Sequence, residues 1–316
     1  MNEHDWVAHV RRRFGANHAA AEVGIGDDAA VLALGSDGRV VSVDAAVEGV
    51  HFRRDWASAQ TLGHRAYVAS LSDLAAMGAR PVAGFFSVIA PADGNPAWLR
   101  GAIDGVAEAA EQHGAPILGG NFSNGPLNAW SFTVVGQLAG AAVRRDGAEP
   151  GDGVFVTGPV GAAALGWRVL AEGGARTSGE EQAVERWRHP QPRFDWVERL
   201  SLGATAAIDI SDGLAADLAH IARASGVTVQ IETARLPLLD GFREAASARG
   251  HDPVTLALGG GEDYELAFTA PLDSEPAKRG HQVGRVVPGN PPVVVLGPDG
   301  ETRSVPEGHR HLSVSP

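Results

Sequence analysis

Short acidic segments recur along this chain beside glycine or at the edge of apolar runs. They are Asp27-Asp28, Asp44, Ser72-Asp73, Asp209-Ile210-Ser211-Asp212 and Glu262-Asp263. Carboxylates gathered in one cleft repel one another, so the arrangement makes sense when Mg2+ and a polyphosphate lie between them. The pattern therefore predicts ATP chemistry.

One of these acids, Asp73, falls on a helical stripe. The stripe has spacings of four, three, four and four and consists of Leu62, Ala66, Ala69, Asp73 and Met77. It predicts a helix near 60–78 with Asp73 on a largely buried face, where a carboxylate needs a metal or a strong donor to offset its burial. Alternatively, the helix breaks at Ser72 and Asp73 caps a second short helix that begins at Leu74. Both interpretations remain open.

A second acidic segment lies between an expected strand and an expected helix. Ala204–Ile210 is an apolar run, and 212–225 has helical spacing and ends at Gly226. Ser211 is the expected N-cap, and a helix that begins at the end of a strand presents free N–H groups to a phosphate. Capping alone explains Ser211, but it does not explain Asp209 in a buried strand. Asp209 and Asp212 are therefore candidate Mg2+ ligands.

Composition limits the class of protein. The 316 residues are 44% hydrophobic and carry a formal charge of −12, which predicts globular domains with real cores and argues against a nucleic-acid partner. No apolar run is long enough to cross a membrane, and the first residues lack the layout of a signal peptide, so we expect a cytoplasmic protein. The absence of cysteine excludes thiolate nucleophiles, disulfides and cysteine metal sites.

The elements that must position the acids are read from periodicity. Expected strands are 40–43, 84–89, 131–138, 154–157, 204–210, 227–231, 264–269, 282–287 and 293–296, and further expected helices are 96–113 and 161–171. A polar, turn-rich segment at 144–153 predicts a boundary between domains 1–143 and 144–316. The segment 173–185 is small, charged and poor in large apolar residues, and it predicts a mobile loop or irregular surface segment.

Several longer blocks of the sequence form a recognisable set. They are Gly26-Asp27-Asp28-Ala29-Ala30, Val43-Asp44, Val47-Glu48-Gly49-Val50-His51-Phe52, Leu71-Ser72-Asp73-Leu74-Ala75-Ala76-Met77-Gly78-Ala79, Asp209-Ile210-Ser211-Asp212-Gly213-Leu214 and Gly260-Gly261-Glu262-Asp263-Tyr264-Glu265-Leu266. Together they resemble the signatures of thiamine-monophosphate kinases, in the aminoimidazole-ribonucleotide-synthetase-like superfamily. The resemblance spans nearly the whole chain in order. Selenophosphate synthetase and the hydrogenase-maturation relative both depend on cysteine or selenocysteine, which this chain lacks.

The resemblance implies an α+β fold of two domains. The N-terminal domain binds ATP and Mg2+ and contributes strands to a barrel in a homodimer, and the C-terminal α+β domain closes over the nucleotide. The implied reaction transfers the γ-phosphoryl group of ATP to the phosphate of thiamine monophosphate. That acceptor is already ionised near neutral pH, so positioning and charge neutralisation by Mg2+ can carry the step without a strong general base.

The resemblance also implies roles for individual residues. The Mg2+ positions are Asp27, Ser42, Asp44, Asp73, Asp209 and Asp212, of which Asp44, Asp73 and Asp212 are the expected catalytic acids. The ATP contacts are Gly120, Asn121, Arg145 and Ser211. The substrate contacts are His51, Glu262 and His309. Without the resemblance, Arg145 would be an exposed linker charge and His51 a packed surface histidine.

Three positions depart from the family pattern. Asn121 stands where the family has a metal-binding aspartate, Val43 where a threonine is common, and His309 where an aromatic residue contacts the thiamine moiety. Two alternatives therefore stand beside the kinase. One is a paralogous ATP-dependent enzyme that acts on another small molecule, and the other is a nucleotide-binding homologue with low activity.

Overall fold

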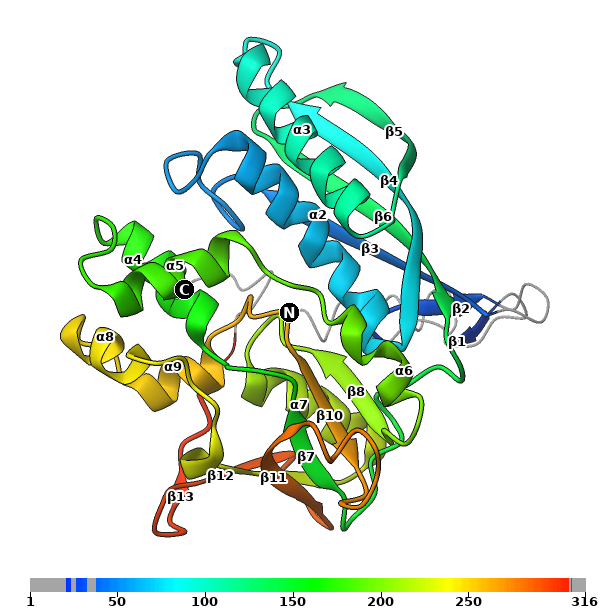
Figure 1. The fold of residues 1–316 in the computed structure, drawn as a ribbon, viewed down its shortest axis with the longest axis vertical. Helices are drawn as coiled ribbons and strands as arrows, with labels where there is room; N and C mark the ends of the chain where they lie inside the picture. The colour runs from blue at the N-terminus through cyan, green and yellow to red at the C-terminus, as the bar shows by residue number, and fades with distance from the viewer. Residues whose placement is uncertain (1–20, 24–26, 33–37, 307, 309–316) are drawn as a thin grey trace.

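Two β-sheets, one from each half of the chain, form the framework of the protein (Figure 1). The computed structural model describes residues 21–23, 27–32, 38–306 and 308. Residues 139–152 link the last strand of the first sheet to the first strand of the second. We propose that the domain boundary lies in this link, between Val143 and Arg144.

The described residues of the N-terminal half form a six-stranded sheet in the order β1-β2-β3-β6-β4-β5. Neighbouring strands are antiparallel except β4 and β5, which run parallel. The strands are β1 (Ala21–Val23), β2 (Ala30–Leu32), β3 (Arg39–Val47), β4 (Ala79–Ala90), β5 (Ile117–Asn124) and β6 (Ala129–Leu138). Sequence reading found the central parts of β3, β4 and β6 and missed β1, β2 and β5.

Two helices, α2 (Ala59–Ala76) and α3 (Pro96–Gln112), lie side by side over one face of this sheet (Figure 1). Their backbones approach closely, because a Cβ at Gly63 would lie 1.9 Å from the carbonyl oxygen of Ala102. α2 is continuous through Ser72, so the alternative in which Asp73 caps a second helix is wrong. Asp73 belongs to the helix interior, as the stripe predicts.

The two faces of the N-terminal sheet differ. The face under the helices is filled by buried aromatic side chains, among them Phe86 and Phe132, which stack at 4.8 Å. On the opposite face Val43, Phe85 and Ile89 are 66%, 43% and 41% exposed. A half-solvated antiparallel sheet ordinarily has polar residues on its outer face. The outer face of this sheet is therefore more apolar than that of an ordinary half-solvated sheet.

The described residues of the C-terminal half form a seven-stranded sheet in the order β13-β12-β9-β11-β7-β10-β8. The strands are β7 (Gly153–Val156), β8 (Ala206–Asp209), β9 (Thr228–Glu232), β10 (Leu266–Ala270), β11 (His281–Val287), β12 (Val293–Leu296) and β13 (Thr302–Arg303). The helices are α4 (Ala162–Ala171), α5 (Ser178–Arg188), α6 (Val197–Leu200), α7 (Leu214–Ser225), α8 (Phe242–Ala248) and α9 (Pro253–Gly259), with short 3-10 turns η1 (Phe194–Trp196) and η2 (Thr233–Arg235). Predicted and observed strands agree to within two residues at most ends.

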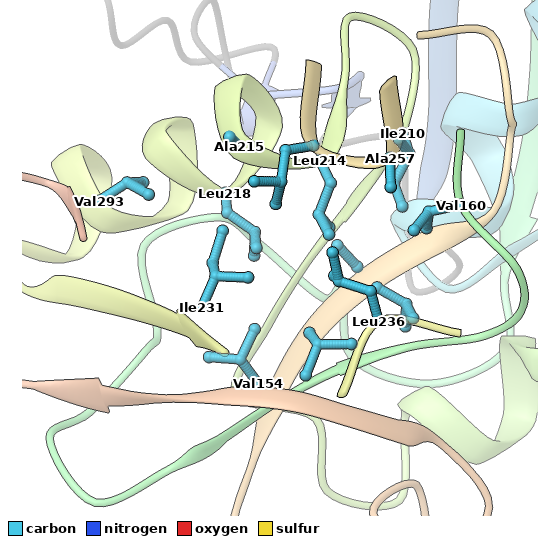
Figure 2. Close-up of a cluster of buried hydrophobic side chains, with 14 of the residues drawn as sticks. Val154, Val160, Ile210, Leu214, Ala215, Leu218, Ile231, Leu236, Ala257 and Val293 are labelled. Carbon is cyan, nitrogen blue, oxygen red and sulfur yellow. The ribbon is translucent and has the colours of Figure 1, made fainter. Parts of the chain in front are cut away.

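The core of this half lies between the sheet and its helices. Leu214 and Leu218 of α7, Ile231 of β9 and Val154 of β7 belong to one buried cluster, and Figure 2 shows Leu218 next to Ile231. Apolar side chains at positions one turn apart on α7 thus hold the helix against the sheet. This packing fixes the turn between β8 and α7, which carries Asp209 and Asp212.

The prediction of an irregular segment at 173–185 is wrong from Ser178 onward, where α5 begins. The Thr177 hydroxyl caps the helix by accepting a hydrogen bond from the N–H of Glu180. Glu180 is buried and pairs with Arg249 at 2.7 Å. One of the charges that favoured a loop, Glu180, therefore belongs to a buried ion pair, which sequence periodicity cannot reveal. Among the described helices, none is long and apolar enough to cross a membrane.

Candidate active site

Three aspartates from distant parts of the chain come together between the two sheets. Asp28, Asp73 and Asp209 each offer a carboxylate oxygen, and these oxygens lie within 4.8 Å of one another. Asp28 lies two residues before β2, Asp73 lies on α2 and Asp209 ends β8. Oxygen donors at this spacing are the ligands that Mg2+ and Ca2+ prefer. We call Asp28, Asp73 and Asp209 the acid cluster.

The acid cluster is electrostatically strained. Burial, followed by the charges of Asp209, Asp28 and Asp44, raises the pKa of Asp73 well above its usual range. Burial and the neighbouring Asp28 raise the pKa of Asp209 to about 8. The carboxylate oxygen Oδ1 of Asp28 is buried and has no hydrogen-bond partner among the described residues. An oxygen in this position is one that a cation can satisfy, so the donor set fits a divalent metal.

Ser42 and Asp44 border the acid cluster from strand β3. The buried Ser42 hydroxyl donates to Asp73 Oδ2 and lies 3.3 Å from the carbonyl oxygen of Asp28. Asp44 is exposed, its Oδ1 accepts the N–H of Ala45 at 2.7 Å, and its charge contributes to the raised pKa of Asp73. Ser42 and Asp44, the predicted metal positions on β3, therefore lie beside Asp73 on α2.

Arg145 faces the acid cluster and does not form an exposed linker charge. Its Nε donates to Asp28 Oδ2 at 2.7 Å and lies 3.7 Å from Asp27 Oδ1, and its backbone N–H donates to Asp27 Oδ2 at 3.2 Å. The two acids raise the pKa of Arg145 above its usual value. Burial and Asp28 raise the pKa of Asp27 to about 6. Arg145 thus pairs with both acids, and of the two only Asp28 also belongs to the acid cluster.

The turn after β8 differs from the prediction. α7 begins at Leu214, its N-cap is Gly213 with φ of 126°, and no side-chain cap bond is formed there, so Ser211 is not the cap. Instead, the buried Asp217 carboxylate accepts the N–H groups of Asp212 and Gly213 at 3.2 and 3.0 Å. Burial, Asp212 and Asp209 raise the pKa of Asp217 well above its usual range. Asp217 fixes the turn from within the helix, six residues beyond Ser211, where a cap was expected.

A second loop, 260–265, is bonded to this turn. The N–H of Glu262 donates to the Ser211 carbonyl at 2.8 Å, and that of Tyr264 donates to the Ile210 carbonyl at 3.0 Å. A Cβ at Gly261 would lie 2.1 Å from the Ser211 carbonyl oxygen, so only glycine permits this approach. The expected acceptor residue Glu262 is thereby held next to the turn that carries Asp209 and Asp212.

The three acids of loop 260–265 have separate partners. Asp263 accepts the N–H groups of Gly161 and Ala163 at 2.5 and 3.0 Å, at the start of α4, and burial raises its pKa to about 7. Glu265 is buried and accepts the Thr157 hydroxyl at 2.6 Å. Glu262, by contrast, borders a small pocket. Only Glu262 of the three is therefore available to a ligand from this pocket.

His51 borders the same pocket, together with Asp44, Arg65 and Tyr264. Its ring Nδ1 accepts the backbone N–H of Val47 at 3.1 Å, which orients the imidazole. The two described substrate contacts predicted from the resemblance, His51 and Glu262, therefore line one pocket. His309 lies outside the described residues. A larger pocket of about 330 Å³, lined by Trp98, Phe122 and Asn128 among others, contains none of the predicted site residues.

Gly120 and Asn121 are not brought to the acid cluster within one chain. Asp44 pairs with Phe132, Phe132 with Phe86, and Phe86 with Gly120, so three strand spacings separate Gly120 from Asp44. At about 4.8 Å per spacing this amounts to roughly 14 Å. Asn121 is exposed on the edge strand β5, and its Nδ2 donates to the Ser123 hydroxyl at 3.1 Å.

Sequence reading did not assign four residues that the structure places in the site. Asp28 could have been found, because it adjoins Asp27 in the same acidic block. Asp217 also carries a weak signal, since a buried acid on the apolar side of a helix needs a donor. Arg65 and Trp187, which contact Glu262, leave no local signal, because 197 and 75 residues separate them from it.

Comparison with known proteins agrees with this geometry. A family model described as AIR synthase related protein, N-terminal domain, matches residues 26–140. The thiamine-monophosphate kinase of Mycobacterium tuberculosis is 39% identical over 286 residues, covering 88% of this chain and 83% of the relative. That of Aquifex aeolicus is 34% identical over 290 residues, covering 91% and 92%.

A solved structure of AaThiL complexed with AMPPCP and TMP superposes with a TM-score of 0.89 at 32% identity, covering 98% of this chain and 97% of that one. This match confirms the predicted α+β fold of the aminoimidazole-ribonucleotide-synthetase-like type. Because the identity is high and extends over most of both sequences, the chain belongs to the thiamine-monophosphate kinase family.

Proposed function

We propose that this chain transfers the γ-phosphoryl group of ATP to the phosphate of thiamine monophosphate and forms thiamine diphosphate. The observation that carries the proposal is the convergence of Asp28, Asp73 and Asp209 within 4.8 Å, beside the loop that presents Glu262. Its family relative AaThiL has been solved in complex with AMPPCP and TMP, which supports an ATP-dependent reaction on this acceptor.

The oxygen donors suit a divalent cation, and we assign it as Mg2+ because phosphoryl transfer from ATP uses this ion. Asp28, Asp73 and Asp209 would hold it directly, and Asp27, Ser42, Asp44 and Asp212 would complete the coordination of this and any further ion. When bound, Mg2+ supplies positive charge that offsets the negative charge on the transferred phosphoryl group. The raised pKa values of Asp73 and Asp209 support this assignment, because they reflect burial of the carboxylates and repulsion between them, both of which a bound cation offsets.

The side chains position the reactants. The acceptor phosphate is already ionised, so the acids do not have to remove a proton from it. Arg145 pairs with Asp28 and Asp27 and spans the region between the acids and the link 139–152, where it can offer its remaining N–H groups to a nucleotide phosphate. Ser211 lies in the turn between Asp209 and Asp212 and is the second expected nucleotide contact.

The acceptor binds at the pocket that Asp44 lines together with His51 and Glu262. In this arrangement its phosphate points toward the acid cluster and its ring system toward Glu262. His309 is the remaining expected acceptor contact. The phosphoryl group is therefore transferred from the nucleotide at Arg145, past the acid cluster, to the acceptor in the pocket.

A homodimer accounts for the uncovered sheet face. Val43, Phe85 and Ile89 present an apolar surface that a second copy of the chain can bury in a shared barrel. Asn121 lies in register with Ser87 and Ser131 on this face, and Gly120 precedes it on the same edge strand. In a dimer these two residues can approach the nucleotide bound by the partner. A cytoplasmic location remains our prediction.

The test is product formation. Purified protein with Mg2+, ATP and thiamine monophosphate is expected to release ADP and thiamine diphosphate in equal amounts, and Asp73→Asn is expected to abolish both while the far-UV circular dichroism stays the same. If Mg-ATP binds and another phosphate acceptor is turned over while thiamine monophosphate is not, the paralogous enzyme is the correct alternative. If no acceptor stimulates ADP release, the chain is a nucleotide-binding homologue.

A further inference from the structure

The Glu262 carboxylate is held by two donors from different parts of the chain. Arg65 Nη2, from α2, lies 2.5 Å from Oε1, and Trp187 Nε1, from α5, lies 3.0 Å from Oε2. Arg65 is 4% exposed and Trp187 is fully buried. Each carboxylate oxygen therefore has one fixed donor in a setting where water competes weakly.

The two donors are also bonded to each other. Arg65 Nη1 donates to the Trp187 carbonyl at 2.7 Å, and the Arg65 guanidinium carbon lies 4.4 Å from the centre of the Trp187 ring. The cation–π contact joins Arg65 to Trp187, and the two hydrogen bonds to Glu262 join both residues to the carboxylate, so the three residues form a closed ring of contacts. We call Arg65, Trp187 and Glu262 the carboxylate clamp.

The backbone of Glu262 is fixed as well. Its φ is 69°, in the left-handed region that non-glycine residues rarely adopt, and its N–H donates to the Ser211 carbonyl. Residues in this region persist when the surroundings hold them there, and such residues concentrate at functional sites. With both backbone and side chain held, the carboxylate cannot rotate away from the pocket.

The clamp also determines what Glu262 can bind. Each oxygen accepts one hydrogen bond from the protein, and a carboxylate oxygen has room for a second. Arg65 and Asp44 line the pocket together with Glu262, and Arg65 already pairs with Glu262, so the remaining acceptor positions of the carboxylate are suited to an N–H donor. The fixed orientation allows a short, directed hydrogen bond without the entropic cost of ordering a mobile side chain.

We infer that Arg65 and Trp187 are positioning residues of the acceptor site. They hold Glu262 so that it accepts a hydrogen bond from the nitrogen-bearing ring end of the acceptor, which leaves the phosphate end directed to the acid cluster. This inference rests on the proposed function, since it deepens the assignment of the pocket lined by His51 and Glu262.

The chain offers a matched pair of variants for the test. Trp187→Phe removes the N–H donor to Glu262 and retains an aromatic ring beneath Arg65. Trp196→Phe is the control, because Trp196 is 1% exposed and its Nε1 has no partner among the described residues. Both substitutions remove the same atoms from a buried site, but only the first removes a bond to the clamp.

Trp187→Phe is expected to raise the KM for thiamine monophosphate about tenfold, which corresponds to about 1.4 kcal/mol. The KM for ATP, the Mg2+ dependence and kcat are expected to stay within about threefold of the wild-type values. Trp196→Phe is expected to leave all four parameters unchanged. Arg65→Lys is expected to retain more of the acceptor affinity than Arg65→Met, because lysine keeps a charged donor.

An unchanged acceptor KM in Trp187→Phe, or an equal fall in kcat in both phenylalanine variants, would overturn the inference. Failure of the proposed function has a different signature, which is a wild-type protein that forms no thiamine diphosphate. In that case the clamp is measured by a double-mutant cycle of unfolding free energies with Trp187→Phe and Glu262→Ala. Non-additive losses support the clamp, and strictly additive losses refute it.

Discussion

Replacement of Asp209 by asparagine is expected to stabilise the protein when metal is absent and to weaken its response to Mg2+. Asp209 is 4% exposed and shares the acid cluster with Asp28 and Asp73. Asparagine keeps the shape and one oxygen and removes the charge. The substitution should therefore weaken metal binding and raise the free energy of unfolding.

The magnitude follows from the geometry in two ways. At the 4.8 Å limit of the acid cluster and an effective dielectric constant of about 20, one pair of like charges repels by about 3.5 kcal/mol. Independently, raising the pKa of Asp209 from 3.8 to about 8 costs the folded protein about 4 kcal/mol at pH 7, at about 1.4 kcal/mol per pH unit. Relaxation of the apo site reduces both values, so we expect a gain of about 2 to 4 kcal/mol in the free energy of unfolding.

The pH dependence has a defined sign. Because the folded pKa of Asp209 lies above its unfolded value, the stability that its proton provides is present below pH 3.8 and is lost as the pH rises through about 8. Asparagine does not titrate, so it avoids this loss. The stability difference between Asp209→Asn and wild type should therefore increase from pH 5 to pH 8.

The assay is urea unfolding in EDTA at pH 5, 7 and 8, repeated in excess Mg2+. The ion should stabilise the wild type by an amount that increases with its concentration, and it should stabilise the variant less. Asp152→Asn is the control, since Asp152 is a buried acid that accepts the Thr205 hydroxyl at 2.6 Å and the Glu149 N–H at 3.0 Å. It is expected to be neutral or destabilising. A stability of Asp209→Asn in EDTA at pH 7 equal to or below that of the wild type would refute the reasoning.

Three further outcomes are expected. Asn121→Asp restores the family carboxylate and should lower the Mg2+ concentration at half-maximal rate several-fold; an unchanged magnesium titration counts against a metal role for this position. Arg249→Met leaves the buried Glu180 without its ion-pair partner and should cost about 3 to 5 kcal/mol in urea unfolding, whereas a loss below about 1 kcal/mol would mean that the pair is dispensable. Gly261→Ala places a Cβ 2.1 Å from the Ser211 carbonyl and should lower kcat/KM at least tenfold; wild-type kinetics would show that the two loops can separate without consequence.

Many of the helices and strands could be predicted from the local pattern of apolar residues. Helix α2, with Asp73 in its interior, and strands β8 and β12 follow from spacings that depend on neighbouring residues only. Strand β5 does not, because its sequence contains two glycines, two asparagines and no clear alternation, and it forms by pairing with β4. Strand propensity depends on such cross-strand neighbours, which periodicity does not contain.

The same distinction between local pattern and contacts in space applies to the active site. The sequence by itself determined which acids are available and that they adjoin turns and apolar runs, and it predicted that a cation offsets their charge. The tertiary structure decided that Asp28 rather than Asp27 joins Asp73 and Asp209, that Arg145 pairs with both members of the first acidic segment, and that Arg65 reaches Glu262 across 197 residues. The physical reason is that charge repulsion, burial and donor geometry depend on distances in space, whereas a sequence pattern specifies only distances along the chain.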